Sequence, residues 1–299
     1  MKEFCDLHVH SVYSDGTWKP AQLIREAERL GLGAVALCDH NTIAGLPEFL
    51  EAARGSTVQA VPGIEFSTEY RGGELHILAL FVRPEHYEAI EKYVQPMKQR
   101  KEQSNLALVA ALKTAGIEVD YGAIKAATPN GQVNRALIAA EMVRQGYCAD
   151  VPEAFRCWLS TEHGYFVPPE RLDVFETIRF IRSIGAVPVL AHPFLNLEEK
   201  ELRKFLELAQ ELGGMETEYV SFTAEQRKLA GKIAEEFGLL RCGGSVFLGE
   251  NKRDILVGTG KGDLQVPIAF LRRLEEKVFG RNDGNIAQMG GNLGRNVIY

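Results

Sequence analysis

Cysteine is scarce in this sequence, and no pair of cysteines has the spacing of a metal-binding or redox motif. The 299 residues include five cysteines, an odd number, and none lies in a CxxC arrangement. This usage argues against a disulfide framework and a zinc knuckle, and it is typical of reduced thiols. The sequence also lacks a charged-then-apolar leader and an apolar run of membrane-spanning length. We therefore expect a cytoplasmic protein.

An excess of positive charge is also missing. Lys and Arg number 34 against 40 Asp and Glu, the formal net charge is -6, and no basic stripe is visible. Proteins that grip long nucleic acids usually carry such a stripe, since phosphate contacts supply most of the affinity. We therefore expect no long nucleic acid as a partner. Small phosphorylated substrates stay open, because a bound metal can supply positive charge locally. No strongly apolar surface helix stands out, which favours a monomer.

Apolar runs typical of buried strands alternate with helical segments along most of the chain, of which 45% is hydrophobic. The turn Arg71-Gly72-Gly73 leaves no room for a helix, so the strands on either side should form an antiparallel hairpin. The alternation predicts a distorted (β/α)7 barrel, an irregular relative of the eight-fold barrel. The seven predicted strands are Phe4–His8, Ala34–Leu37, Val58–Ile64, Leu75–Phe81, Ala186–Leu190, Met215–Val220 and Leu239–Gly243.

A helical segment interrupts this alternation in the middle of the chain. Residues 84–163 show apolar residues at three- and four-residue spacing almost throughout, so we expect an inserted all-helical subdomain there. The barrel is accordingly predicted in two parts, residues 1–83 and residues 164–279. Residues 280–299 form a Gly- and Asn-rich tail to which no function is assigned.

Residues that commonly bind metal ions cluster in and just after the predicted strands. In parallel barrels the carboxyl ends of the strands meet at one rim, which holds the active site. A single histidine at a strand end is more often an ordinary core residue, but five on one rim predict a metal centre. Imidazole and carboxylate ligands together suit Zn, Mn or Fe. The candidate ligands are His8, His10, Asp15, His40, Glu65, His76 and His192.

Four motifs resemble those of a known family. They are DLHVHSVYSDGT (residues 6–17), CDHNT (38–42), PGIEFS (62–67) and AHP (191–193). Together they resemble the successive motifs of the PHP (polymerase and histidinol phosphatase) phosphoesterases, and the likeness covers essentially the whole chain. The sequence is most similar to the subgroup of small nucleotide phosphatases and 5'-to-3' oligoribonucleotide exonucleases.

The resemblance implies a metal-dependent phosphoesterase. Metal-activated hydroxide would hydrolyse phosphate esters of nucleotides, such as AMP or a 3',5'-bisphosphorylated nucleoside, or of short oligoribonucleotides. The ions would be shared among three sites, with Asp15 and His40 also catalytic. By resemblance these sites are a first of His8, His10 and Glu65, a second of Glu65, His76 and His192, and a third of Asp15 and His40.

The sequence departs from the family pattern at two expected metal ligands. The family's last motif typically reads GSDFHG, whereas residues 244–249 read GSVFLG, so Val246 and Leu248 replace an aspartate and a histidine. Neither apolar side chain can bind a metal ion, which weakens the third site, and we expect two ions rather than three. Arg135 resembles an arginine that clamps the substrate phosphate, although a surface helix arginine is an equal interpretation. A phosphate-contacting lysine is absent, since residues 163–165 read HGY where the family reads GKP.

Two other functions compete with this enzyme. The replacements at Val246 and Leu248 motivate a degenerate PHP protein that holds metal and a phosphorylated ligand with little or no turnover. The seven surviving candidate ligands favour the enzyme instead. A histidinol-phosphatase-like enzyme of amino-acid biosynthesis is a weaker alternative, because the helical insertion and the residues of the motifs argue against it.

Overall fold

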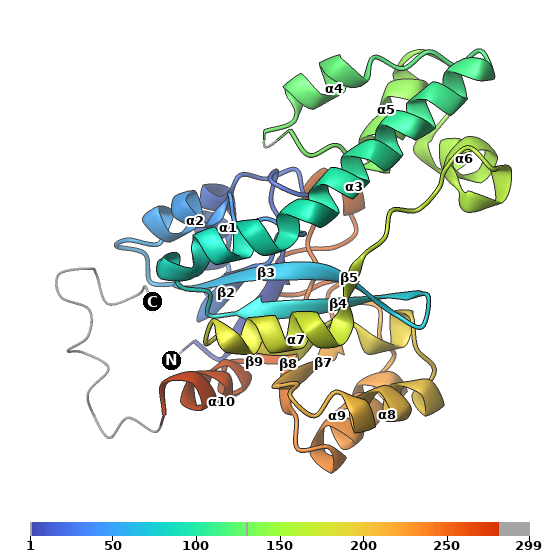
Figure 1. The fold of residues 1–299 in the computed structure, drawn as a ribbon. Coiled ribbons are helices and arrows are strands. Elements are labelled where there is room, and N and C mark those ends of the chain that lie inside the picture. The colour runs from blue at the N-terminus through green and yellow to red at the C-terminus, as the bar shows by residue number, and fades with distance from the viewer. Residues whose placement is uncertain (1, 130, 281–299) are drawn as a thin grey trace. The chain divides into compact units, whose positions relative to one another are not determined.

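The computed structural model describes residues 2–129 and 131–280, and these form two units (Figure 1). The first unit takes the described residues up to Ile90 and from Leu172 onward, and the second spans Glu91–Arg171. All of the predicted tail beyond Gly280 lies outside the described residues. Within the part that is described, no helix is both long and apolar enough to cross a membrane.

The strands of the first unit form one sheet with the order β8-β7-β6-β4-β3-β2-β1-β9, and β5 pairs with β3. Pairing is parallel from β1 to β3 and from β6 to β8, and β4 is antiparallel to both β3 and β6. The described strands are β1 Phe4–Val9, β2 Ala34–Leu37, β3 Gln59–Tyr70, β4 Gly73–Leu80, β5 Leu172–Asp173, β6 Val187–Leu190, β7 Gly214–Tyr219, β8 Leu240–Gly244 and β9 Val266–Pro267.

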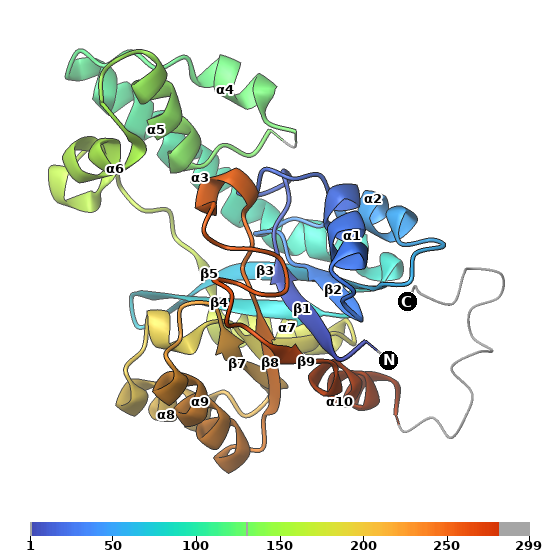
Figure 2. The ribbon, with the colours of Figure 1, turned by 180° about the vertical axis from the view of Figure 1, so that it is seen from behind.

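The sheet closes on itself where the chain after β8 runs along the end of β1 (Figure 2). The Val246 N–H donates to the His8 carbonyl at 2.8 Å, and the His10 N–H donates to the Phe247 carbonyl at 3.0 Å. Gly244 permits this approach, because a Cβ there would lie 2.5 Å from the Cβ of His8. The predicted distorted (β/α)7 barrel and its antiparallel hairpin are confirmed. The two-residue strands β5 and β9 were not predicted, because so short a segment carries no periodic pattern.

Helices bury their apolar faces against this sheet. Helix α1 begins at Pro20 and buries Leu23, Ile24 and Ala27. One core cluster draws side chains from seven strands and from Leu271 and Leu274 of α10. The helices of the first unit are α1 Pro20–Arg29, α2 Leu46–Ala52, α7 Val174–Ser183, α8 Glu199–Leu208, α9 Ala224–Glu236 and α10 Ile268–Phe279.

The second unit has a hydrophobic core of its own, which includes Leu108, Ile138 and Phe166. Three of its helices begin at polar caps, and the Asn134 side chain, for example, accepts the Leu137 N–H. Its bounds, Glu91–Arg171, begin and end later than the predicted 84–163. Helix α3 crosses the first of these boundaries, since it runs unbroken from Tyr87 to Thr114. The helices here are α3 Tyr87–Thr114, α4 Tyr121–Ala127, α5 Arg135–Arg144 and α6 Val151–Ala154.

Candidate metal centre

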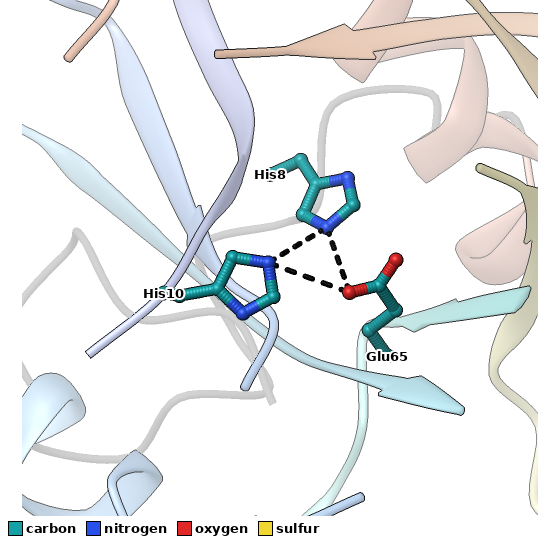
Figure 3. A group of neighbouring side chains, drawn as sticks. All are labelled: His8, His10 and Glu65. Atoms are coloured by element: carbon teal, nitrogen blue, oxygen red, sulfur yellow. Dashed lines mark hydrogen bonds and ion pairs between the residues drawn. The ribbon is translucent and has the colours of Figure 1, made fainter. Parts of the chain in front are cut away.

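Glu65 lies at the centre of the predicted ligands, within β3. It was expected to end the third strand, but the hairpin with β4 extends β3 to Tyr70. Its side chain is fully buried. Glu65 Oε2 lies 3.2 Å from His8 Nε2 and 3.4 Å from His10 Nε2, and these three side chains point toward one another (Figure 3). His40 Nδ1, from the loop after β2, lies 3.0 Å from the same oxygen.

The other carboxylate oxygen of Glu65 faces two further histidines. Glu65 Oε1 lies 2.9 Å from Nδ1 of His76, which β4 supplies, and 3.1 Å from Nε2 of His192, which follows β6. One buried carboxylate therefore has imidazoles from five different chain positions around it. Such an arrangement suits a carboxylate that bridges two metal ions.

Asp15 joins the cluster from the loop that follows β1. Its Oδ1 lies 3.4 Å from His10 Nδ1, and its Oδ2 lies 3.8 Å from His40 Nε2. All seven predicted ligands thus meet in one place, although they come from segments far apart in the sequence. Three sets of possible ligand atoms have members within 4.8 Å of one another, namely His8 with His10 and Glu65, His10 with Asp15 and His40, and His40 with Glu65 and His76.

The chemistry of this donor set fits divalent cations. In the described part of the chain, the buried atoms without a hydrogen-bond partner include Glu65 Oε2, His40 Nδ1 and His192 Nδ1, even though the first two lie 3.0 Å apart. Buried polar atoms without partners are costly and rare in native proteins. A carboxylate oxygen with several imidazole nitrogens around it is what ions of the Zn, Mn or Fe type would satisfy.

Burial and mutual charge set the ionisation of the central residues. Burial acts to raise the pKa of Glu65, but the imidazoles of His40, His8 and His76 hold that pKa well below its usual range. Burial acts to lower the pKa of His8, yet the carboxylates of Glu65 and Glu216 outweigh it and raise that pKa to about 10. The pKa of His76 is raised to about 10 against the same effect of burial, chiefly by Glu65. Without metal, the negative charge of Glu65 is therefore balanced by protonated histidines.

His10 behaves differently from His8. Its burial lowers its pKa to about 3, and the neighbouring His40 and His8 act in the same direction against the attraction of Asp15. Burial opposes a lower pKa for Asp15, but His10 and His40 hold it below its usual value. A neutral imidazole beside an ionised carboxylate is the pair of protonation states that metal binding requires.

Two buried carboxylates behind the ligands were not predicted as site residues. Asp39 accepts the Ser11 N–H at 2.7 Å and the Ser14 hydroxyl at 2.6 Å, and that hydroxyl lies 3.3 Å from His10 Nδ1. Burial raises the pKa of Asp39 to about 6. Glu216 of β7 lies 3.0 Å from His8 Nδ1. The sequence does contain a clue to Glu216, because an acidic residue is unusual in a strand that is buried on both faces.

The two departures from the family pattern lie beside the end of β1. Val246 and Leu248 are both buried. Val246 adopts a φ of 50°, a left-handed conformation that is uncommon for a β-branched residue. Aspartate tolerates this conformation better than valine. The backbone therefore keeps a shape that suits the aspartate of the family motif, although the side chain cannot bind a metal ion.

Arg135 lies in the second unit, at the start of α5. Its guanidinium stacks over the ring of Phe166, 4.0 Å from the centroid, and donates to the Leu159 carbonyl at 2.9 Å. Part of its bonding capacity thus stabilises its own unit. The phosphate contact predicted for Arg135 stays a prediction.

Comparison with known proteins places the chain in a family. A model of the PHP domain matches residues 6–149. A 5'-3' exoribonuclease from Haemophilus influenzae is 33% identical over 245 residues, which cover 81% of this chain and 89% of that protein. A 3',5'-nucleoside bisphosphate phosphatase from Chromobacterium violaceum is 26% identical over 257 residues, which cover 84% of this chain and 90% of that protein.

A solved structure supports the same placement. A protein from Bifidobacterium adolescentis, described as a metal-dependent phosphoesterase, matches with a TM-score of 0.79 and 26% identity, over 91% of this chain and 95% of that protein. The fold and the cluster around Glu65 define a barrel protein with a candidate metal centre. The chain belongs to the PHP family, as its motifs indicated.

Proposed function

We propose that this protein is a metal-dependent phosphoesterase that hydrolyses phosphate esters of nucleotides or short oligoribonucleotides. The observation that carries the proposal is the buried Glu65 carboxylate with five imidazoles around its two oxygens. The relatives support an enzyme over a degenerate binding protein, because those from Haemophilus influenzae and Chromobacterium violaceum are an exoribonuclease and a phosphatase. We expect a cytoplasmic monomer that does not bind long nucleic acid.

Two ions, of Mn, Zn or Fe, are expected at this centre. Bound there, they would supply positive charge to the phosphate oxygens and make a water molecule more acidic. The third site should be weak, because Val246 and Leu248 supply no ligand beside Asp15 and His40. The ligands of the two stronger sites are His8, His10 and Glu65 for the first, and Glu65, His76 and His192 for the second.

Asp15 and His40 form the accessible side of the centre. Their side chains are 31% and 26% exposed, whereas those of His8 and His10 are fully buried. The substrate should therefore approach past Asp15 and His40. A proton held at His40 Nε2, which faces Asp15, can be donated to the oxygen that leaves the phosphate. Arg135 is the candidate that the resemblance offers for binding the phosphate oxygens.

Phosphate release is the direct test. Purified protein with added Mn²⁺ is incubated with 5'-AMP, with 3',5'-bisphosphorylated adenosine and with a short RNA. His8→Ala is the inactive variant, and His86→Ala is a matched control because His86 lies outside the cluster. Activity that His8→Ala loses and His86→Ala keeps would support the proposal. Well-folded wild-type protein that acts on none of the three substrates would favour the degenerate binding protein.

A further inference from the structure

Glu216 is a buried acidic residue for which the proposed reaction provides no role. It lies in β7, and its side chain is wholly inaccessible to solvent. A carboxylate in such a place is costly unless hydrogen bonds compensate for the lost water. Both oxygens of Glu216 have such partners. Its Oε1 lies 3.0 Å from Nδ1 of His8, and its Oε2 accepts the backbone N–H of His192 at 2.7 Å.

We propose that Glu216 is a positioning residue that holds His8 and His192 together in the geometry required for metal binding. The proposal rests on the metal centre described above. The two histidines face different oxygens of Glu65, since His8 Nε2 lies 3.2 Å from Oε2 and His192 Nε2 lies 3.1 Å from Oε1. Glu216 therefore links the two sides of the centre from behind.

The contact with His8 selects which ring nitrogen carries the proton in the metal-binding form. A carboxylate oxygen accepts hydrogen bonds, so in this arrangement His8 Nδ1 donates to Glu216 Oε1. The lone pair of the neutral ring is then left on Nε2, the nitrogen that faces Glu65. Carboxylates placed behind metal-binding histidines in this way orient the ring and make it a stronger ligand.

The contact with His192 holds a strained backbone. His192 has φ 30° and ψ 57°, a left-handed conformation that residues other than glycine seldom adopt. Such a conformation persists only where the surroundings enforce it. The charge-assisted hydrogen bond from the His192 N–H to Glu216 is one such restraint, and it directs the ring toward Glu65.

A neighbouring glutamate shows that position alone does not create this role. Glu218 lies in the same strand, after an irregularity in the pairing of β7 with β8. Its carboxylate pairs with Arg241 at 2.8 Å. Glu218 thus has a cationic partner on the outer side of the strand, whereas Glu216 contacts two metal ligands. This difference makes Glu218→Gln a matched control.

The test compares Zn²⁺ binding by wild type, Glu216→Gln and Glu218→Gln, measured by competition with a chromophoric chelator. Glutamine has nearly the same shape, but its amide has one acceptor oxygen and cannot accept from both N–H groups. We expect Glu216→Gln to weaken Zn²⁺ binding by about 10–100-fold, and Glu218→Gln to leave it unchanged. Glu216→Asp keeps the charge but is too short to reach both partners, so its affinity should fall between those of wild type and Glu216→Gln.

A second measurement separates positioning from mere structural support. Protein labelled with ¹⁵N-histidine reports which nitrogen of each ring carries a proton, and His8→Ala identifies the signals of His8. Wild type loaded with Zn²⁺ should show His8 protonated at Nδ1, and Glu216→Gln should lose or broaden that state. An affinity of Glu216→Gln within about twofold of wild type, with unchanged His8 signals, would overturn the role of Glu216. Wild-type protein that binds no Zn²⁺ would overturn the metal centre itself.

Discussion

The two oxygens of Glu65 divide the candidate metal centre into two halves that depend on different parts of the barrel. His76 and His192 form the Oε1 half and come from β4 and the end of β6, two strands that pair with each other. His8, His10 and His40 form the Oε2 half.

The Oε2 half adjoins the segment after β8, where the departures from the family pattern occur. The Val246 N–H donates to the His8 carbonyl. The family motif has a metal-binding aspartate at the position of Val246. The Oε1 half keeps every ligand that the resemblance implies, whereas the Oε2 half has lost two neighbours. We therefore expect the two halves to differ in metal affinity. Glu65 and Glu216 each contact histidines of both halves and so connect them.

The strongest test of this comparison removes the residue that both halves share. Glu65→Gln takes away the negative charge and replaces one acceptor oxygen with a donor, so both halves should lose their ions. We expect metal affinity to fall by more than about 100-fold, beyond the loss typical of residues behind the ligands. Metal content after dialysis provides the measurement, with Glu218→Gln, whose carboxylate pairs with Arg241, as the control. Near-normal metal content in Glu65→Gln would contradict the central position of Glu65.

The stability of the metal-free protein should depend on pH through one histidine in each half. The pKa of His8 and that of His76 are raised to about 10 without metal, because Glu65 outweighs the opposing effect of burial. A histidine whose pKa rises on folding stabilises the fold fully below about pH 6.5, and this stabilisation is lost as the pH approaches the raised value. We therefore expect the Tm of the metal-free protein to fall as the pH rises above about 6.5.

Metal binding should have the opposite pH dependence. Zn²⁺ requires neutral imidazoles, so its affinity should rise about tenfold per pH unit for each proton released. Calorimetry at pH 6.5 to 8.5, in pairs of buffers with different ionisation enthalpies, counts those protons. A Zn²⁺ affinity that does not change over this range would show that the histidines are already neutral in the metal-free protein.

Restoring the family ligands should sharpen the comparison by strengthening the weaker half. Val246→Asp combined with Leu248→His supplies a carboxylate and an imidazole beside the end of β1. We expect a gain of about tenfold in affinity for the weakest ion, measured by titration of metal content. Leu256→His provides the control, since that side chain is 57% exposed. Unchanged occupancy in the double variant would mean that these two positions do not face the ions.

The smallest effect on metal binding is expected for Arg135, which lies outside both halves. Arg135→Lys keeps the charge but loses the planar fork that suits phosphate. If Arg135 contacts the substrate, KM for a nucleotide should rise by about 10-fold, roughly the loss of one charge-assisted hydrogen bond, and metal affinity should not change. Arg144→Lys, an exposed arginine of the same helix paired with Glu141, is the matched control. Equal KM values in the two variants would assign Arg135 to the stability of the second unit.

Local pattern was enough to predict the main strands, but not their exact ends or their shortest partners. The run Ala34–Leu37 is apolar and fully buried, so its strand was predicted with the observed bounds. Helix α7 begins only at Val174, because residues 172–173 pair with β3 and Asp173 caps the helix. That pairing depends on residues about a hundred positions away, which no local period reports.

The sequence by itself determined the candidate ligands, because His8, His10, Asp15, His40 and Glu65 fall in motifs whose spacing follows the strand ends. Only the tertiary structure decided which oxygen of Glu65 each histidine faces. The same is true of Glu216, which reaches His8 and His192 from β7, a strand outside the four motifs quoted above. The physical reason is that a strand and the residues at its end are encoded by local sequence. Which of these residues come into contact depends on how the strands close into a barrel.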